Sequence, residues 1–107
     1  MGQVATNSEM DLRRAARHRA SHKAIVESRR YGDKEVHIVN ISAHGFMIEC
    51  NTAFERGDRV ELRLPAVGRI EAHMIWAVED RAGFQFERVI RLPEFLALLE
   101  EVGVKVR

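Results

Sequence analysis

The sequence predicts an all-β dominated fold with six short antiparallel strands, arranged as a barrel or a sandwich, and one C-terminal amphipathic helix. Segments rich in β-branched and aromatic residues recur at intervals of roughly ten residues, with turn residues between them. This spacing is typical of barrels and sandwiches, because parallel βαβ units would place a helical segment between consecutive strands. Near the C-terminus, the apolar spacing changes from the period of a strand to that of a helix.

The first three strands are predicted in the N-terminal half of the chain. Strand residues run from 24 to 30, turn residues occupy 31–34, and the strand pattern resumes at 36–41, which predicts a hairpin. A second turn at 42–45 leads into the third strand. By the two-residue period of a strand, the inward residues of this third strand are Phe46, Ile48 and Cys50.

The later strands alternate more regularly. Apolar residues at positions 60, 62 and 64 alternate with charged residues, as in a half-buried antiparallel strand, and Pro65 ends this strand. The segment 69–78 forms the next strand, and 83–87 forms the last one, with Phe84 and Phe86 on one face. The inward residues predicted for segment 69–78 are Ile70, Ala72, Met74 and Trp76.

A helix is predicted over residues 93–102. Pro93 suits the first turn of a helix, where its missing N–H is not needed, and Gly103 is a typical stop signal. The helix must bury its apolar stripe, whose residues are Phe95, Leu96, Leu98, Leu99 and Val102.

The composition indicates one globular domain. The chain has 107 residues, of which 46% are hydrophobic and 31% are charged, and these values are typical of globular rather than disordered proteins. It has no apolar run of about eighteen residues, and the start MGQVATNSEMD has no apolar signal-peptide region, so we expect no membrane insertion and a cytoplasmic location. The single cysteine cannot form an internal disulfide, which agrees with a reducing compartment.

Charge is distributed unevenly along the chain. Residues 1–34 carry eight lysines and arginines against four acids, whereas residues 35–107 carry nine against twelve. The stretch from Leu12 to Ala24 contains no acid, and its cations are Arg13, Arg14, Arg17, Arg19 and Lys23. An anionic partner is therefore expected at this end, while the net charge of +1 argues against a general nucleic-acid binder.

Two polar motifs flank the first predicted hairpin. The motif Arg13-x-x-x-Arg17 offers guanidinium groups, which bind phosphate oxygens or the O6/N7 edge of guanine in a bidentate way. The motif Asn40-x-Ser42-x-x-Gly45 offers an amide, a hydroxyl and a residue without a Cβ, which together can read a base edge at close range. We therefore expect the two motifs to bind one phosphorylated purine ligand.

In this order and separation, the two motifs resemble those of the PilZ domain family, the bacterial receptor module for cyclic di-GMP. The resemblance runs from about Leu12 to the late 90s and includes Val60–Leu64, the Ile75–Trp76 pair and Gly83–Phe86. It implies a single domain at 12–103 whose strands close into a six-stranded split barrel. The parts that it implies are a flexible tail at 1–11, a ligand-binding arm at 12–22, the β-barrel at 23–88 and the helix at 93–102.

The resemblance also implies a function. It points to a cytoplasmic receptor without enzymatic activity, cofactor or metal, which binds cyclic di-GMP with its arm and then signals to an unidentified effector protein. Arg13 and Arg17 would contact phosphate and guanine from the arm, and the arm would fold over the barrel face that bears Asn40, Ser42 and Gly45. Further candidates for ligand contact are Arg14, His44 and Trp76.

Two departures from the family pattern keep other functions open. Leu12 stands where many members carry another arginine, and Asn40 stands where aspartate is frequent, so the alternative is a ligand-free PilZ-like module that binds a partner protein. Single-stranded nucleic-acid binding is less favoured, because the phenylalanines fall mostly on inward faces. His18 and His22 have the spacing of a helical metal-ligand pair, but they lie among cations, which oppose metal binding.

Overall fold

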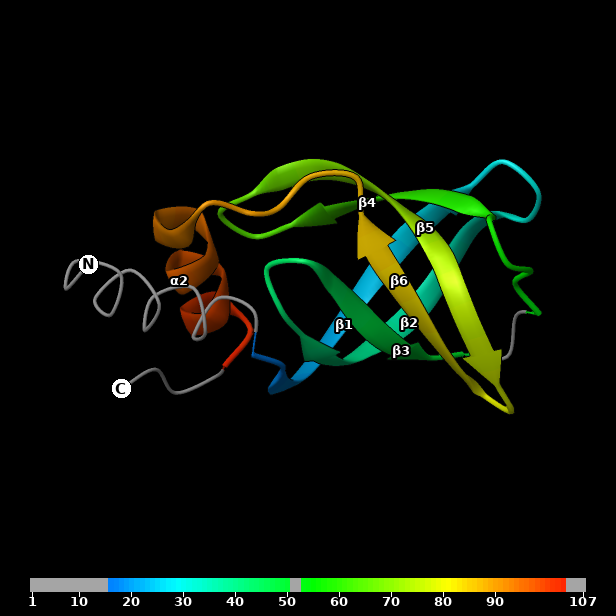
Figure 1. The fold of residues 1–107 in the computed structure, drawn as a ribbon, viewed down its shortest axis with the longest axis horizontal. Coiled ribbons are helices and arrows are strands. Elements are labelled where there is room, and N and C mark those ends of the chain that lie inside the picture. Colours follow the sequence, from blue (N-terminus) through cyan, green and yellow to red (C-terminus); the bar gives the residue numbers. More distant parts are fainter. Residues whose placement is uncertain (1–15, 51–52, 104–107) are drawn as a thin grey trace, which may run out of the picture.

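The part of the chain that the structure describes folds into a closed six-stranded antiparallel β-barrel with one C-terminal helix, one of the two architectures that the strand spacing predicts (Figure 1). The computed structural model describes residues 16–50 and 53–103. Around the barrel, the strands follow the order β1-β2-β3-β6-β5-β4. The elements are β1 (His18–Ser28), β2 (Gly32–Ile41), β3 (Gly45–Glu49), β4 (Arg59–Leu64), β5 (Gly68–Val78), β6 (Arg81–Phe86) and α2 (Leu92–Glu101).

Strand β1 begins earlier than the strand pattern in the sequence. It starts at His18 and so includes residues 18–22, which the sequence assigned to the arm. In this part of β1, His18, Ala20 and His22 are partly buried, whereas the residues between them are exposed. The alternation is hard to recognise in the sequence, because alanine is depleted in strands and the exposed residues are all polar.

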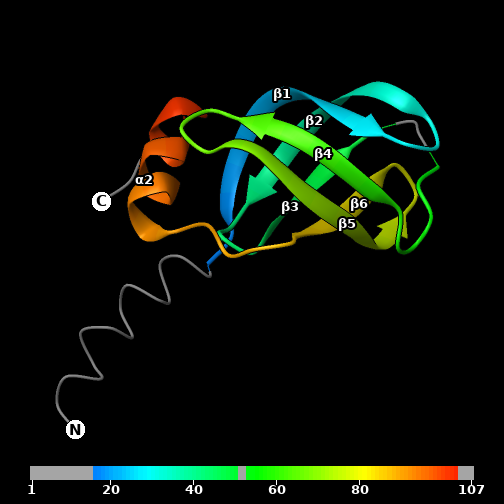
Figure 2. The ribbon, with the colours of Figure 1, turned by 90° about the horizontal axis from the view of Figure 1, so that it is seen from above.

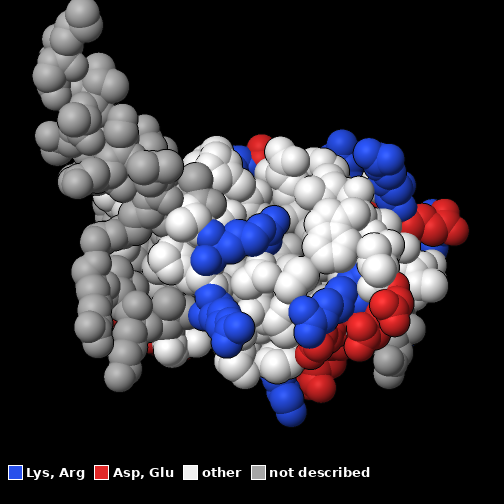
Figure 3. All heavy atoms as spheres, turned by 60° about the horizontal axis from the view of Figure 1, so that its bottom comes forward, with Lys and Arg blue, Asp and Glu red and all other residues white. Residues whose placement is uncertain are grey.

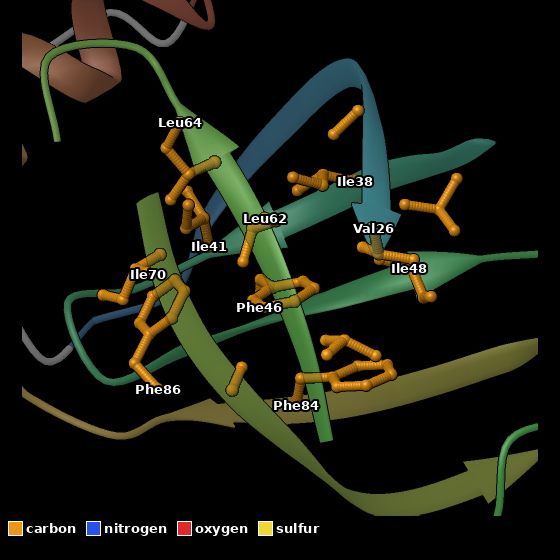
Figure 4. Close-up of a cluster of buried hydrophobic side chains, with 14 of the residues drawn as sticks. Val26, Ile38, Ile41, Phe46, Ile48, Leu62, Leu64, Ile70, Phe84 and Phe86 are labelled. Atoms are coloured by element: carbon orange, nitrogen blue, oxygen red, sulfur yellow. The ribbon is translucent and has the colours of Figure 1, made fainter. Parts of the chain in front are cut away.

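The interior of the barrel is filled by aliphatic side chains around a group of phenylalanines (Figure 4). Phe46 and Phe84 are fully buried and stack with their ring centroids 5.1 Å apart, and the ring of Phe86 lies 5.3 Å from that of Phe46. These residues lie on the faces that the alternation predicted. Cys50 differs from its prediction as a buried strand residue, because β3 ends at Glu49 and Cys50 is only half-buried beyond it.

Helix α2 covers one end of the barrel, next to the beginning of β1 (Figures 1 and 2). The ring of Phe95 lies 5.7 Å from the imidazole of His18, and the N–H of Ile90 donates to the carbonyl of Ala43 at 2.9 Å. The buried residues of the helix are Phe95, Leu98 and Leu99. Within the described part of the chain, no helix is long and apolar enough to cross a membrane.

At the other end of the barrel, the turn between β1 and β2 contacts the loop before β4. The Tyr31 hydroxyl donates to the Ala53 carbonyl at 2.7 Å. The guanidinium of Arg30 lies 3.0 Å from Asp58 and 3.2 Å from Glu55, and these two carboxylates, Asp58 first, raise the pKa of Arg30. The arginine therefore stays charged and links the turn to the loop.

The barrel closes along a short seam, because β1 and β4 pair only over residues 26–28 and 60–62. On the outside of this seam, Glu27 lies opposite Glu61, and Glu61 lies opposite Glu71. Like charges directly opposite each other destabilise a sheet. Arg69 offsets this repulsion, since its guanidinium contacts Glu61 and lies 3.2 Å from Glu27.

We expect Arg69→Ala to lower the free energy of unfolding by about 1 kcal/mol, because an exposed ion pair contributes up to about 1 kcal/mol and the glutamates would lose their counter-charge. Urea unfolding measures this loss. Arg63→Ala is the comparison variant: Arg63 is exposed directly opposite Arg69 and forms no ion pair with any described residue, so its removal ends a like-charge pair and should cost no stability. Equal losses in the two variants, or a loss that about 1 M salt does not reduce, would contradict this role of Arg69.

Candidate functional site

One row of residues crosses five strands on the outside of the barrel. Arg19 lies opposite Asn40, Asn40 opposite Met47, Met47 opposite Gly83, and Gly83 opposite Trp76. We call these five residues the outer row. Because neighbouring strands lie about 4.8 Å apart, the path along the curved barrel wall from Asn40 to Trp76 is about 14 Å.

The pairing register shifts in β1, β2 and β5 where these strands meet the outer row. Such a bulge inserts one extra residue, so the side chains beyond it change face. Ile38 and Ile41 are both buried, and Asn40 between them is turned outward. The prediction that Trp76 points inward is wrong: Trp76 is 36% exposed, because the shift between Met74 and Trp76 breaks the two-residue period.

Arg17 of the first motif meets Asn40 of the second. Its Nη1 donates to Asn40 Oδ1 at 2.7 Å, and Asn40 Nδ2 donates to Met47 Sδ at 3.7 Å. The amide of Asn40 is thus held with its oxygen towards the arginine and its nitrogen towards the methionine. A guanidinium carries five N–H donors, so the bond to Asn40 leaves several that can bind an anion at this exposed position.

The rest of the second motif shapes the turn between β2 and β3. Ser42 is 3% exposed, and its Oγ accepts a hydrogen bond from the His44 N–H at 3.1 Å. Gly45 is buried at the start of β3, where a Cβ would lie 2.1 Å from the Phe84 carbonyl oxygen. Its φ is not in the positive range, so packing against β6 is what requires a glycine here. His44 is exposed on the same turn.

The structure therefore brings part of the predicted site together. Asn40 and Trp76 lie in the outer row, Arg17 contacts Asn40, and Arg13 and Arg14 lie outside the described residues. Sequence reasoning did not single out the two other polar or polarisable members of the row. Arg19 could have been found from its place in the basic stretch without acids. Met47 could have been placed on the outer face because it lies between two inward residues of β3.

The charge pattern favours an anionic ligand at the outer row. Arg17 and Arg19 are both exposed there, whereas most of the acidic side chains visible in Figure 3 lie towards the end of the barrel opposite α2. Two hollows elsewhere on the barrel are less suitable, because carboxylates repel anions. One, of about 340 Å³, is lined in part by Glu49 and Asp80, and the other, of about 560 Å³, in part by Glu27, Glu61 and Glu71.

Metal binding gains no support from side-chain placement. Within residues 16–50 and 53–103, no three histidine, cysteine, aspartate or glutamate side chains are grouped so that they could hold a metal ion. His18 and His22, which had the spacing of a helical ligand pair, lie on a strand instead. A spacing of four residues brings two side chains together on a helix, but on an extended strand it places them far apart along the chain.

Comparisons with known proteins agree with the fold and with the resemblance to the PilZ family. The model of the PilZ domain family matches residues 11–102. Among solved structures, the crystal structure of the PilZ domain of CeSA from a cellulose-synthesizing bacterium is similar, with a TM-score of 0.59 and 16% sequence identity over 82% of this chain and 95% of that chain. At this identity, the likeness shows a shared fold. A search of curated proteins found no match.

Proposed function

The chain belongs to the PilZ domain family, and from this premise we propose that it is a receptor for cyclic di-GMP. PilZ domains are binding domains rather than enzymes, and they are generally receptors for this second messenger. The observation that carries the proposal is the 2.7 Å bond between Arg17 and Asn40, because it joins the two motifs on one exposed surface. The residues proposed to form the ligand site are Arg13, Arg17, Asn40, Ser42 and Gly45, of which Ser42 and Gly45 are buried and would shape the turn, with Arg14, His44 and Trp76 as further contacts.

Each exposed group of this surface has a chemical counterpart in the ligand. Cyclic di-GMP carries two phosphates and two guanines, and the guanidinium of Arg17 suits either a phosphate or the O6/N7 edge of a base. The amide of Asn40 accepts hydrogen bonds through one oxygen, so it reads a guanine edge less strongly than a carboxylate would. The indole of Trp76 offers a face for a base to stack on. Ser42, being buried, would act by holding the turn.

The arm was expected at residues 12–22, but residues 18–22 already belong to β1, so binding would order only the part of the arm ahead of this strand and so act as a switch. Fixing the backbone of one residue costs roughly 1–2 kcal/mol, so only a short segment can be ordered by one ligand. A contact to a charged partner contributes about 1.5–3 kcal/mol, and a micromolar dissociation constant corresponds to about −8 kcal/mol. A few charge-assisted contacts from the arm are therefore sufficient. We propose that the changed surface is recognised by an effector protein in the bacterial cytoplasm.

A titration of the full chain tests the proposal. Cyclic di-GMP should bind in calorimetry and raise the melting midpoint, because a ligand selective for the folded state stabilises it by mass action. Cyclic di-AMP is the matched control, since adenine presents a donor where guanine presents the O6 acceptor, and its effect should be much smaller. If saturating cyclic di-GMP leaves the midpoint unchanged, the receptor function is wrong.

The second candidate is a ligand-free module that binds a partner protein through the same fold. Its support is Asn40 in place of the frequent aspartate, and the fact that Arg17 and Asn40 already satisfy each other across the motifs. An unchanged melting midpoint with both dinucleotides would favour this candidate.

A further inference from the structure

We propose that Gly83 is a positioning residue that seats the indole of Trp76 on the outside of β6. The inference rests on the proposed function, because it places the indole on the ligand surface that includes Asn40. Gly83 itself would touch no ligand. It would act by leaving the space in which the indole lies.

The indole occupies the place that a side chain on residue 83 would take. A Cβ built on Gly83 would lie 2.1 Å from Trp76 Nε1, 2.4 Å from Cε2 and 2.8 Å from Cδ1. Non-bonded carbon atoms normally approach to about 3.5–4.0 Å, so no side chain fits beneath this ring. Gly83 is accordingly buried, although Arg81 and Gln85, which share its outward face of β6, are exposed.

The backbone gives no other reason for a glycine at this position. The described glycines with positive φ are Gly32, Gly57, Gly68 and Gly103, and Gly83 is not among them. An L-residue can therefore adopt its backbone conformation. A glycine inside a strand often marks the close approach of another group, and here that group is the indole.

Its position over Gly83 brings the indole closer to Asn40. The backbone of Trp76 lies on β5, but its ring extends over β6, one strand closer to β2. With strands about 4.8 Å apart, this shortens the path along the barrel wall to Asn40 from about 14 to about 10 Å. Met47 is the one outer-row residue that lies between them. The aromatic face and the amide then border one surface, as a ligand with two bases requires.

Gly83→Ala tests directly whether the space above this residue positions the indole. The chain has one tryptophan, so its fluorescence reports on this site alone. In the variant, we expect the emission of the ligand-free protein to shift to longer wavelength, because the displaced indole is more exposed to water. Since one base stacked on an aromatic ring typically contributes about fivefold to a hundredfold in affinity, cyclic di-GMP should bind about tenfold more weakly.

Two further variants separate positioning from damage to the strand. Gln85→Ala changes the next outward residue of β6 and should alter neither the emission nor the affinity. In Trp76→Ala the ring is absent, so adding Gly83→Ala should change neither the melting midpoint nor the affinity any further. Local damage to β6 would instead make the double variant melt below Trp76→Ala.

The inference would be overturned if the tryptophan emission of Gly83→Ala were unchanged. It would also be overturned if the losses in melting midpoint or affinity caused by the two single substitutions added up in the double variant. Failure of the proposed function looks different. In that case the wild-type protein does not bind cyclic di-GMP, while the emission of Gly83→Ala and the melting midpoints of the variants still decide whether Gly83 seats the indole.

Discussion

Arg17→Ala should weaken cyclic di-GMP binding by about tenfold to a hundredfold. The variant loses a contact to a charged partner, which contributes about 1.5–3 kcal/mol, and each 1.4 kcal/mol corresponds to a factor of about ten in affinity. It also loses the bond to Asn40 that joins the two motifs. Stability should change little, since Arg17 is exposed, so calorimetric titration isolates the effect on binding.

Three further arginine variants show whether the effect is specific to the arm and to the guanidinium group. Arg63→Ala removes the same charge from the outside of β4, away from the outer row, and should bind normally. Arg17→Lys keeps the charge but loses the planar fork, so its affinity should lie between those of the wild type and Arg17→Ala. Arg13→Ala should resemble Arg17→Ala, as the first motif predicts. Wild-type affinity in both alanine variants would refute the assignment of the arm.

Gly45→Ala should lower the free energy of unfolding by about 3 kcal/mol, the upper part of the usual range for overpacked cores. Its new methyl group would lie 2.1 Å from the Phe84 carbonyl oxygen and 3.1 Å from the Gln85 Cα. Both are backbone atoms of β6, so they cannot turn away as a flexible side chain does. Relief requires β3 and β6 to separate, which disturbs the stacked rings of Phe46 and Phe84.

Denaturant unfolding and thermal melting measure this loss, which corresponds to a fall in midpoint of roughly 10–20 °C for a domain of this size. Gly68→Ala separates crowding from backbone strain. Gly68 has a φ of +85° but open space around it, so its replacement should cost only about 1–2 kcal/mol. If Gly45→Ala were as stable as Gly68→Ala, the close approach of the two strands would not be the reason for the glycine.

Regular alternation made much of the barrel predictable. In β4 every second residue is buried, from Val60 to Leu64, and in β6 Phe84 and Phe86 are buried as expected. Period two is a property of the extended backbone itself, so these assignments need no knowledge of the neighbouring strands. The PilZ resemblance was likewise visible in the sequence, because both motifs are short and contiguous, and the family match confirmed it.

The misplacement of Trp76 has a physical cause in the barrel. A bulge adds a residue to one strand of a pair, and whether it forms depends on the register of both strands, which neither segment reveals alone. Counting by two from Met74 therefore placed Trp76 inside the barrel, although the shift turns it outward. The same irregularity in β2 turns Asn40 to the surface. The candidate site lies where the sequence pattern was least regular.

The outer row has a consequence for how recognition is linked to folding. Its five members come from β1, β2, β3, β6 and β5, and the pairing of β3 with β6 joins segments far apart in the chain. A half-assembled chain lacks this long-range pairing and presents only fragments of the surface. A ligand that contacted Asn40 and Trp76 together, as proposed, would bind only the folded barrel, and it would then add to the small free energy of unfolding of this domain by an amount that rises with ligand concentration.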